Sequence, residues 1–264
     1  MEISLILNIA GFNIKINFHH TQWDLLYKLK QKEIKKNLAG FINKGKPEKI
    51  DYEIAFLEAS YLRFIKKKVT KRYYINLFEE VSNRKIITYY QISFVQFQVI
   101  LRMIINILLK NQGFIIHASA SNIKGKALLF LGKSGAGKST TMKFLNHKYQ
   151  SLADDTVIIK KENSNYFFYQ TPFIEKEAWV KKTNKRYGLG SIFFIKKAKF
   201  FKKEKISDKN KILNLLIKQL WTNDENDIKN KTAALFKYLY QSGNFFYLYL
   251  KKNSKQMINY ISRL

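Results

Sequence analysis

The sequence predicts an α/β fold in which a mainly β sheet surrounds a glycine-rich loop, with a β-rich N-terminal extension on the same body. Three patterns lead to this prediction. Apolar residues alternate over 3–18, as they do in paired strands, and they follow helical spacing over 93–109. Residues 127–145 show the order strand, glycine-rich loop and helix. We expect two regions, 1–92 and 93–264.

The N-terminal region is expected to be rich in short strands. Strands over 3–9 and 12–18 join near Gly11, a helix follows, and 43–47 forms a turn. Nothing in this region indicates a role. The helix is predicted over 25–36, and further strands over 52–57, 61–65, 72–77 and 85–92.

The C-terminal region is expected to alternate strands and helices around the loop. After the helix over 93–109, a hairpin joins strands 114–120 and 127–131 through a turn at 122–125. An irregular section from Thr171-Pro172 is expected to approach the ligand, and Ser207 to cap a helix. The other elements are strands over 156–159, 166–169, 191–195 and 245–250, and helices over 140–145, 209–221, 229–240 (stopped by Ser242-Gly243) and 254–261.

Residues 132–139, Gly-Lys-Ser-Gly-Ala-Gly-Lys-Ser, match the phosphate-binding pattern G-x-x-x-x-G-K-[ST] in full. Its glycines allow a tight turn, and the loop N–H groups and the helix N-terminus then face one point. Lys138 should reach the terminal phosphates and Ser139 should ligate Mg²⁺. A chance match in a glycine-rich turn is the alternative. The predicted site for a purine nucleotide, ATP with Mg²⁺, comprises Gly132, Lys133, Ser134, Gly135, Ala136, Gly137, Lys138, Ser139 and Thr140.

Paired aspartates, Asp154 and Asp155, follow this loop and lead into the β-branched run 156–159. At a strand edge beside a bound triphosphate, one carboxylate can hold Mg²⁺ and the other can accept a proton from an attacking hydroxyl. A solvated turn between helix and strand is the alternative.

The segments 114–120, 128–140 and 152–155 together resemble the catalytic domain of HPr kinase/phosphorylase and its relatives. That family carries a histidine on the strand before the loop, a loop of the form G-x-S-G-x-G-K-S and an Ala-Asp-Asp triplet. The more distant phosphoenolpyruvate carboxykinases share this arrangement. The chain is most similar to the short HPr-kinase-like proteins of bacterial peptide-modification clusters. The resemblance is sharp over 114–160 and extends to about 222, whereas 1–90 shows only a loose likeness.

The resemblance implies a P-loop kinase core and assigns roles to matching positions. It gives Lys138 and Ser139 to phosphate and Mg²⁺, and it places His117 near the transferred phosphoryl group. It assigns metal binding and proton acceptance to the pair Asp154 and Asp155. Asp155 is the expected metal ligand beside Ser139, but which aspartate takes which role stays open. A histidine that only fills a strand position is the alternative for His117.

One motif departs from the family. Its members carry a signature close to E-[IV]-R-G-[LM]-G-[IV], whereas this chain has Asn-Lys-Arg-Tyr-Gly-Leu-Gly over 184–190, with an extra Tyr187 and no glutamate. We expect Arg186 to cap the phosphates, since a guanidinium suits developing charge there; an ordinary basic loop is the alternative. The missing acid argues against HPr itself as the substrate.

Composition limits the class of protein. The 264 residues include no cysteine, which excludes disulfides and thiolate metal sites. The N-terminus lacks the basic start of a signal peptide, and the apolar stretch 94–109 is interrupted by polar residues. We therefore expect a cytoplasmic protein that does not enter the membrane.

The formal net charge of +29 invites a nucleic-acid interpretation. Against it, only six of the 48 basic residues are arginine, and the lysines are spread along the chain. We expect most lysines to form solvated faces, and the basic surface to attract an acidic protein or peptide; a nucleic acid is the less favoured alternative.

The leading functional hypothesis is Mg-ATP-dependent phosphoryl transfer to a hydroxyl, with a serine of a protein or ribosomal peptide as acceptor. A nucleotide-binding regulatory or scaffold subunit without kinase activity is the second hypothesis, and a nucleic-acid-dependent ATPase the third. The particular acceptor, GTP in place of ATP, the reverse reaction and homo-oligomerisation stay open.

Overall fold

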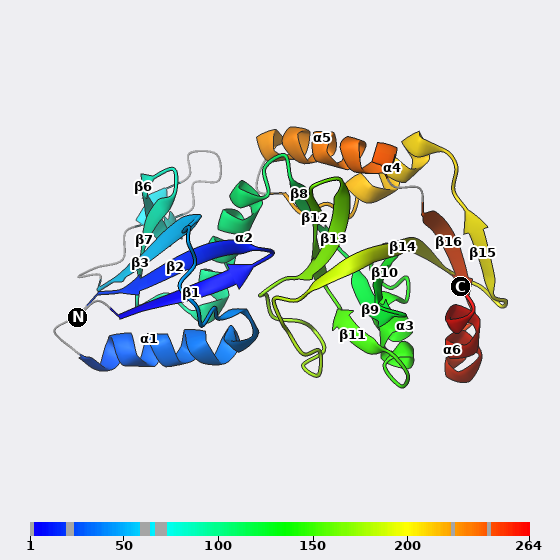
Figure 1. Ribbon diagram of the computed structural model, residues 1–264, viewed down its shortest axis with the longest axis horizontal. Helices are drawn as coiled ribbons and strands as arrows, with labels where there is room; N and C mark the ends of the chain where they lie inside the picture. The colour runs from blue at the N-terminus through cyan, green and yellow to red at the C-terminus, as the bar shows by residue number, and fades with distance from the viewer. Residues whose placement is uncertain (1–2, 20–23, 59–63, 67–72, 223–224, 242–243) are drawn as a thin grey trace. The chain divides into compact units, whose positions relative to one another are not determined.

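The computed structural model describes residues 3–19, 24–58, 64–66, 73–222, 225–241 and 244–264 (Figure 1). The chain divides into two compact units, Met1–Leu108 and Leu109–Leu264. The division falls after helix α2 (Phe94–Leu108), later than the expected boundary at residue 92. Helix α2 clusters with the first unit because Phe97 packs on Phe56, with ring centroids 5.3 Å apart.

The first unit contains a sheet of order β1-β2-β3-β7-β6, in which β2, β3 and β7 run parallel. The expected hairpin over 3–18 is confirmed, with positive φ at Ala10 and Gly11 in its turn. Strand β6 was not expected, because its residues are largely exposed and carry no apolar alternation. The elements are β1 (Ile3–Ile9), β2 (Phe12–Phe18), α1 (Asp24–Asn37), a 3₁₀ turn (Ala39–Phe41), β3 (Tyr52–Leu57), β6 (Phe78–Ser82) and β7 (Lys85–Tyr89).

Two short strands, β4 (Phe64–Lys66) and β5 (Tyr73–Ile75), pair separately. They overlap the expected strands over 61–65 and 72–77; residues 61–63 and 72 lie outside the described residues, whereas 76–77 are described and belong to no strand.

The second unit is built on a larger sheet of order β11-β9-β10-β14-β13-β12-β8, with β16 paired to β14 and β15. Strand β14 runs parallel to both β10 and β16, whereas the other pairings are antiparallel. The strands are β8 (Gly113–His117), β9 (Ser119–Ile123), β10 (Lys126–Leu131), β11 (Gln150–Ala153), β12 (Thr156–Glu162), β13 (Asn165–Gln170), β14 (Arg186–Lys197), β15 (Lys202–Lys205) and β16 (Phe245–Leu250).

Helices cover both faces of this sheet (Figure 1). On one face, Phe130, Phe193 and Leu248 pack with Leu145 and Met257 of α3 and α6. On the other face, alternate residues of the same strands pack against α4 and α5. Strand β10 is therefore buried on both sides, as its continuous apolar run indicates. The helices are α3 (Lys138–Leu145), α4 (Lys209–Ile217), α5 (Glu225–Gln241) and α6 (Ser254–Ser262).

The expected strand over 114–120 is two strands. Strand β8 pairs with β12, whereas β9 pairs with β10 and β11, and the break lies at Ala118, whose N–H donates to the backbone oxygen of Asp155 at 3.0 Å. The hairpin is thus β9–β10, with positive φ at Lys124 and Gly125 in its turn. The segment has neither glycine nor proline at the break, so the sequence gives no turn signal there.

Other expectations also need correction. The helix cap is Asp208 and not Ser207, because the Asp208 carboxylate accepts a hydrogen bond from Lys211 N. Helix α4 ends at Ile217 and α5 begins at Glu225. Strands β11 and β15 were not expected, since both are short. The expected stop at Ser242-Gly243 lies outside the described residues.

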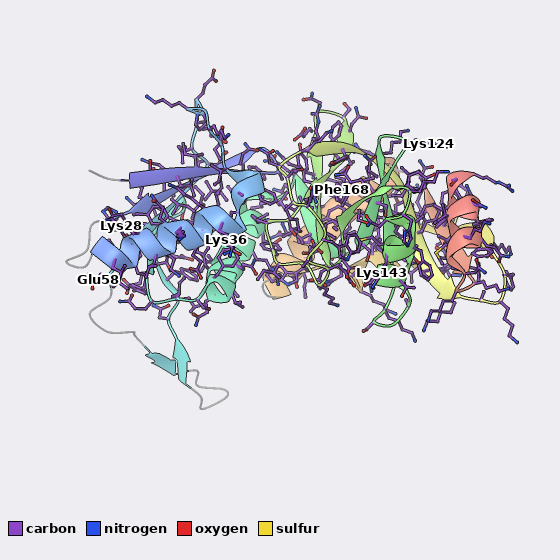
Figure 2. The ribbon with its side chains drawn as sticks, turned by 90° about the horizontal axis from the view of Figure 1, so that it is seen from below. Lys28, Lys36, Glu58, Lys124, Lys143 and Phe168 are labelled. Atoms are coloured by element: carbon purple, nitrogen blue, oxygen red, sulfur yellow. The ribbon has the colours of Figure 1, made fainter. Side chains whose placement is uncertain are left out.

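Lysines lie mainly at the surface of each unit. Lys28 and Lys36 on α1, and Lys124 and Lys143 in the second unit, are exposed, while Phe168 is fully buried (Figure 2). This agrees with the interpretation of the lysines as solvated faces. Among the described helices, none is long and apolar enough to cross a membrane.

We predict that Gly113→Ala destabilises the protein by about 1–3 kcal/mol, because the added methyl group would clash with backbone atoms, which cannot move aside as a side chain can. A Cβ at Gly113 would lie 2.3 Å from the backbone oxygen of Ile159 and 2.9 Å from Lys160 Cα. Gly188→Ala is the matched control in the same sheet, since its Cβ would meet only Lys126 Cγ at 3.9 Å. Urea unfolding should separate the two variants; equal midpoints would contradict the packing seen here.

Candidate active site

The glycine-rich loop connects β10 to α3 in the way the pattern predicts. Glycines 132, 135 and 137 have φ values of 153°, 74° and 104°, a range that side chains with a Cβ avoid. At Gly132 a Cβ would also lie 2.9 Å from the Cβ of Ala136. The predicted strand, loop and helix are therefore all present, and the loop conformation requires its glycines.

Lys138, the first residue of α3, folds back into the loop. Its Nζ donates to the backbone oxygen of Gly132 at 2.6 Å and to that of Lys133 at 3.3 Å. Burial lowers the pKa of Lys138, and the nearby ammonium of Lys176 lowers it further, while the two aspartates oppose these effects. The ammonium of Lys138 thus lies among the loop carbonyls, where it can reach an anion held by the loop.

The loop forms one side of a cavity of about 1610 Å³ at the carboxyl ends of β10, β14 and β16. Ligand sites in open α/β sheets lie at such ends. The cavity wall is strongly basic, since eight lysines and two aspartates line it. The lysines are Lys133, Lys138, Lys176, Lys196, Lys197, Lys218, Lys251 and Lys252.

Asp154 and Asp155 lie in the connection from β11 to β12 and both line the cavity. Asp154 is 2% exposed, and its Oδ1 accepts a hydrogen bond from Ser119 Oγ at 3.0 Å. Its buried Oδ2 has no hydrogen-bond partner among the described residues. Asp155 is more open, with 31% of its side chain exposed. The two carboxylates therefore have different environments.

His117 ends β8 and lies beside Asp155. In the antiparallel pairing of β8 with β12, His117 is opposite Thr156, the residue after Asp155. The distance from His117 Nδ1 to Asp155 Oδ1 is 3.9 Å, and His117 also lines the cavity. Sheet pairing thus brings the histidine and the aspartates to one place.

A divalent cation fits the residues at this place. A buried carboxylate oxygen without a protein partner, as on Asp154, is costly unless something pairs with it. The described residues contain no group of three or more histidine or acidic side chains that could hold a metal. Mg²⁺ bound with a nucleotide takes only one or two carboxylates, with phosphate and water oxygens completing its shell.

The structure places Arg186 elsewhere. Gly188 pairs with Lys126 at the start of β10, so Arg186 lies near the end of that strand opposite the loop. Its guanidinium donates to Glu162 Oε2 at 2.8 Å and lies 4.4 Å from the ring centroid of Phe167. Arg186 is not among the cavity-lining residues. The geometry therefore does not support the expectation that it caps phosphates.

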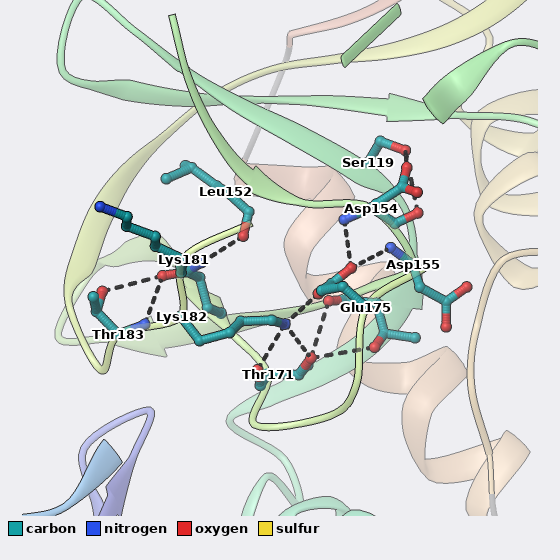
Figure 3. Close-up of polar contacts among 11 residues, drawn as sticks. Ser119, Leu152, Asp154, Asp155, Thr171, Glu175, Lys181, Lys182 and Thr183 are labelled. Carbon is teal, nitrogen blue, oxygen red and sulfur yellow. Dashed lines mark hydrogen bonds and ion pairs between the residues drawn. The ribbon is translucent and has the colours of Figure 1, made fainter. Parts of the chain in front are cut away.

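Three residues that the sequence did not single out also belong to the site: Glu175, Lys176 and Lys182. All three lie in the irregular section after β13, which was expected to approach the ligand. Lys176 lines the cavity, with its Nζ 3.9 Å from Asp155 Oδ1. Glu175 and Lys182 lie behind the aspartates (Figure 3). Single charged residues in a loop without a motif carry no signal of such roles.

The second unit is thus an α/β unit built around the strand, loop and helix of a P-loop protein, and the expected α/β class is confirmed. Residues 84–212 are similar to the family described as SynChlorMet cassette protein ScmC. A solved structure, the Hpr(Ser) kinase/phosphatase from Coxiella burnetii, matches with 14% identity over 35% of this chain and 72% of its own, at a TM-score of 0.26. No curated protein sequence matches the chain.

We predict that Lys138→Met weakens Mg-ATP binding by about tenfold or more, because hydrogen bonds to charged groups contribute roughly 1.5–3 kcal/mol. Arg186→Ala should change the dissociation constant by less than about twofold, since the cavity is not lined by Arg186. Titration calorimetry of both variants gives the comparison. A large loss of affinity in Arg186→Ala would mean that this arginine reaches the nucleotide after all.

Proposed function

We propose that the second unit is a Mg-ATP-dependent kinase that transfers the γ-phosphoryl group to a hydroxyl, with a serine of a protein or ribosomal peptide as acceptor. One observation carries the proposal: the whole glycine loop, both aspartates and His117 line the same lysine-rich cavity. A phosphate cradle and a candidate proton acceptor are two of the components that phosphoryl transfer uses.

The cavity supports an acceptor larger than a metabolite. Its volume of about 1610 Å³ exceeds that of ordinary small-molecule sites, roughly 300–1,000 Å³. The nucleotide would occupy the side formed by the loop, which leaves room beside it for a segment of another chain. The similarity of 84–212 to a cassette protein supports a substrate encoded in the same gene cassette.

The aspartates take different roles in the proposal. Asp154, with its free buried oxygen, and Ser139 would hold Mg²⁺, which when bound neutralises charge on the phosphate oxygens. The more exposed Asp155 is the base. This division differs from the expected metal ligands, Ser139 and Asp155, and rests on the different environments of the two carboxylates.

In the reaction, the acceptor oxygen attacks the γ-phosphorus in line. The bond from that phosphorus to the β,γ-bridging oxygen breaks, and ADP leaves with the electron pair. Asp155 accepts the proton of the hydroxyl, and His117 Nδ1 lies 3.9 Å from the Asp155 carboxylate, beyond direct hydrogen-bond distance. Lys138 and the loop N–H groups neutralise the negative charge that develops.

A nucleotide-binding regulatory subunit without kinase activity is the second candidate. The observation that favours it is the position of Arg186, because the cavity then has no arginine among its lining residues in the part of the chain described. Lysine supplies charge but not the planar fork that a guanidinium offers to a transferring phosphoryl group.

We predict that Asp155→Asn abolishes phosphoryl transfer while Mg-ATP affinity stays within about threefold, because a base acts on the acceptor proton and adds little to nucleotide binding. Purified wild type, Asp155→Asn and Lys138→Met would be incubated with γ-labelled Mg-ATP and an extract of the cells that encode the protein. Label should appear on a peptide or protein only with the wild type.

The alternative outcomes identify the other candidates. Normal transfer by Asp155→Asn would contradict the role of this residue. Label released only as inorganic phosphate would indicate an ATPase, and stimulation by RNA that disappears with added salt would indicate a nucleic-acid-dependent one. Bound nucleotide without turnover would favour the regulatory subunit.

A further inference from the structure

We propose that Glu175, held by Lys182, is a positioning residue that fixes the Asp154–Asp155 turn from behind and places Lys176 in the cavity. The inference rests on the proposed function, whose site these aspartates form. Figure 3 shows the arrangement, with Glu175 between the backbone of the aspartates and Lys182.

The central contact is a carboxylate that accepts two consecutive backbone N–H groups. Glu175 Oε2 accepts from Asp154 N at 2.6 Å and from Asp155 N at 2.9 Å. The side chain of Glu175 is only 4% exposed, so water competes little for these bonds. Such charge-assisted hydrogen bonds are about twice as strong as neutral ones. They fix the backbone from which both aspartate side chains leave.

Lys182 completes the arrangement. Its ammonium contacts Glu175 Oε1 and donates to the backbone oxygen of Thr171 at 2.9 Å. Burial lowers the pKa of Lys182, while the carboxylate of Glu175 acts in the opposite direction. Buried ion pairs of this kind contribute little net stability compared with apolar residues of the same size. A role in placing groups therefore explains the pair better than a role in stability does.

Gln170 fastens the same loop at a second place. Its Nε2 donates to the backbone oxygen of Leu152 at 2.5 Å and to that of Lys181 at 2.9 Å. Its Oε1 accepts from Thr183 N at 3.0 Å. The loop between β13 and β14 is thus tied to β11 just before the aspartates and to the aspartates themselves, so the turn and the loop are held as one body.

Lys176 gains its position from this body. As the neighbour of the anchored Glu175, it projects into the cavity with 73% of its side chain exposed and its Nζ 3.9 Å from Asp155 Oδ1. A solvated lysine at that place can contact the transferred phosphoryl group or its acceptor. Glu175 therefore fixes the positions of Asp154 and Asp155 through its own hydrogen bonds, and that of Lys176 through the chain.

Single substitutions would not isolate the acceptor role, since removing either charge leaves the other buried and unpaired. Two double variants avoid this. E175Q/K182M keeps a side-chain oxygen that can accept from the two N–H groups, whereas E175L/K182M has similar volume and no acceptor. Glu177→Gln is the control for loss of another glutamate carboxylate in the same loop, where Glu177 accepts from Trp179 Nε1 at 2.8 Å and contacts neither aspartate N–H.

Backbone amide exchange gives a readout that does not depend on kinase activity. In the wild type, the N–H groups of Asp154 and Asp155 should exchange at least about tenfold more slowly than those of Lys176 and Glu177. In E175L/K182M this protection should be lost, and it should be retained in E175Q/K182M and in Glu177→Gln. Absence of protection in the wild type would overturn the proposal even if a variant failed to fold.

Transfer kinetics give the second readout. We expect kcat of E175L/K182M to fall by about tenfold to 100-fold with little change in KM for ATP, since a displacement of about 1 Å at a reacting group costs that much. E175Q/K182M should stay within about threefold of wild type. Equal kcat and equal exchange in the two double variants would overturn the proposal. If the wild type transfers no phosphoryl group, the kinase assignment fails, and exchange alone decides the role of Glu175.

Discussion

The parallel pairing of β14 with β10 and with β16 determines where chemistry can occur in the second unit. These strands end at one edge of the sheet, where the glycine loop begins after β10. Lysines form the end of β14 and the residues directly after β16. Backbone N–H groups at such an edge, with the start of α3, favour negative charge. The place of the cavity follows from strand direction, and its basic character follows from the residues in which the strands end.

The antiparallel pairing of β8 with β12 supplies the other half of the site. It sets His117 opposite Thr156, and Asp155 therefore lies beside the histidine although the glycine loop and α3 separate them in sequence. Ser119, at the start of β9, reaches Asp154 from the same break between strands. The division of 114–120 into two strands is thus what allows one short segment to contact both aspartates.

A second layer of polar contacts lies behind these residues. Gln170 and the carboxylate of Glu175 are buried, Lys182 is half-buried, and together they join the loop after β13 to the aspartates, in a region where apolar side chains would fill the space at lower cost. Polar networks of this kind specify one arrangement because each misplaced group would lose its partner in a medium of low dielectric. The precision of the site and its cost in stability have the same origin.

Local patterns allowed much of the fold to be predicted from the sequence alone. The loop over 132–139 depends on the backbone of consecutive residues, and the hairpin over 3–18 and helix α2 show clear periodicity. Strands β6, β11 and β15 were missed because short or exposed strands carry too little apolar signal. The location of Arg186 and the contacts of Glu175 depend on strands and loops distant in sequence. Tertiary structure alone decided these, because hydrogen bonds between remote segments leave no period or spacing in the chain.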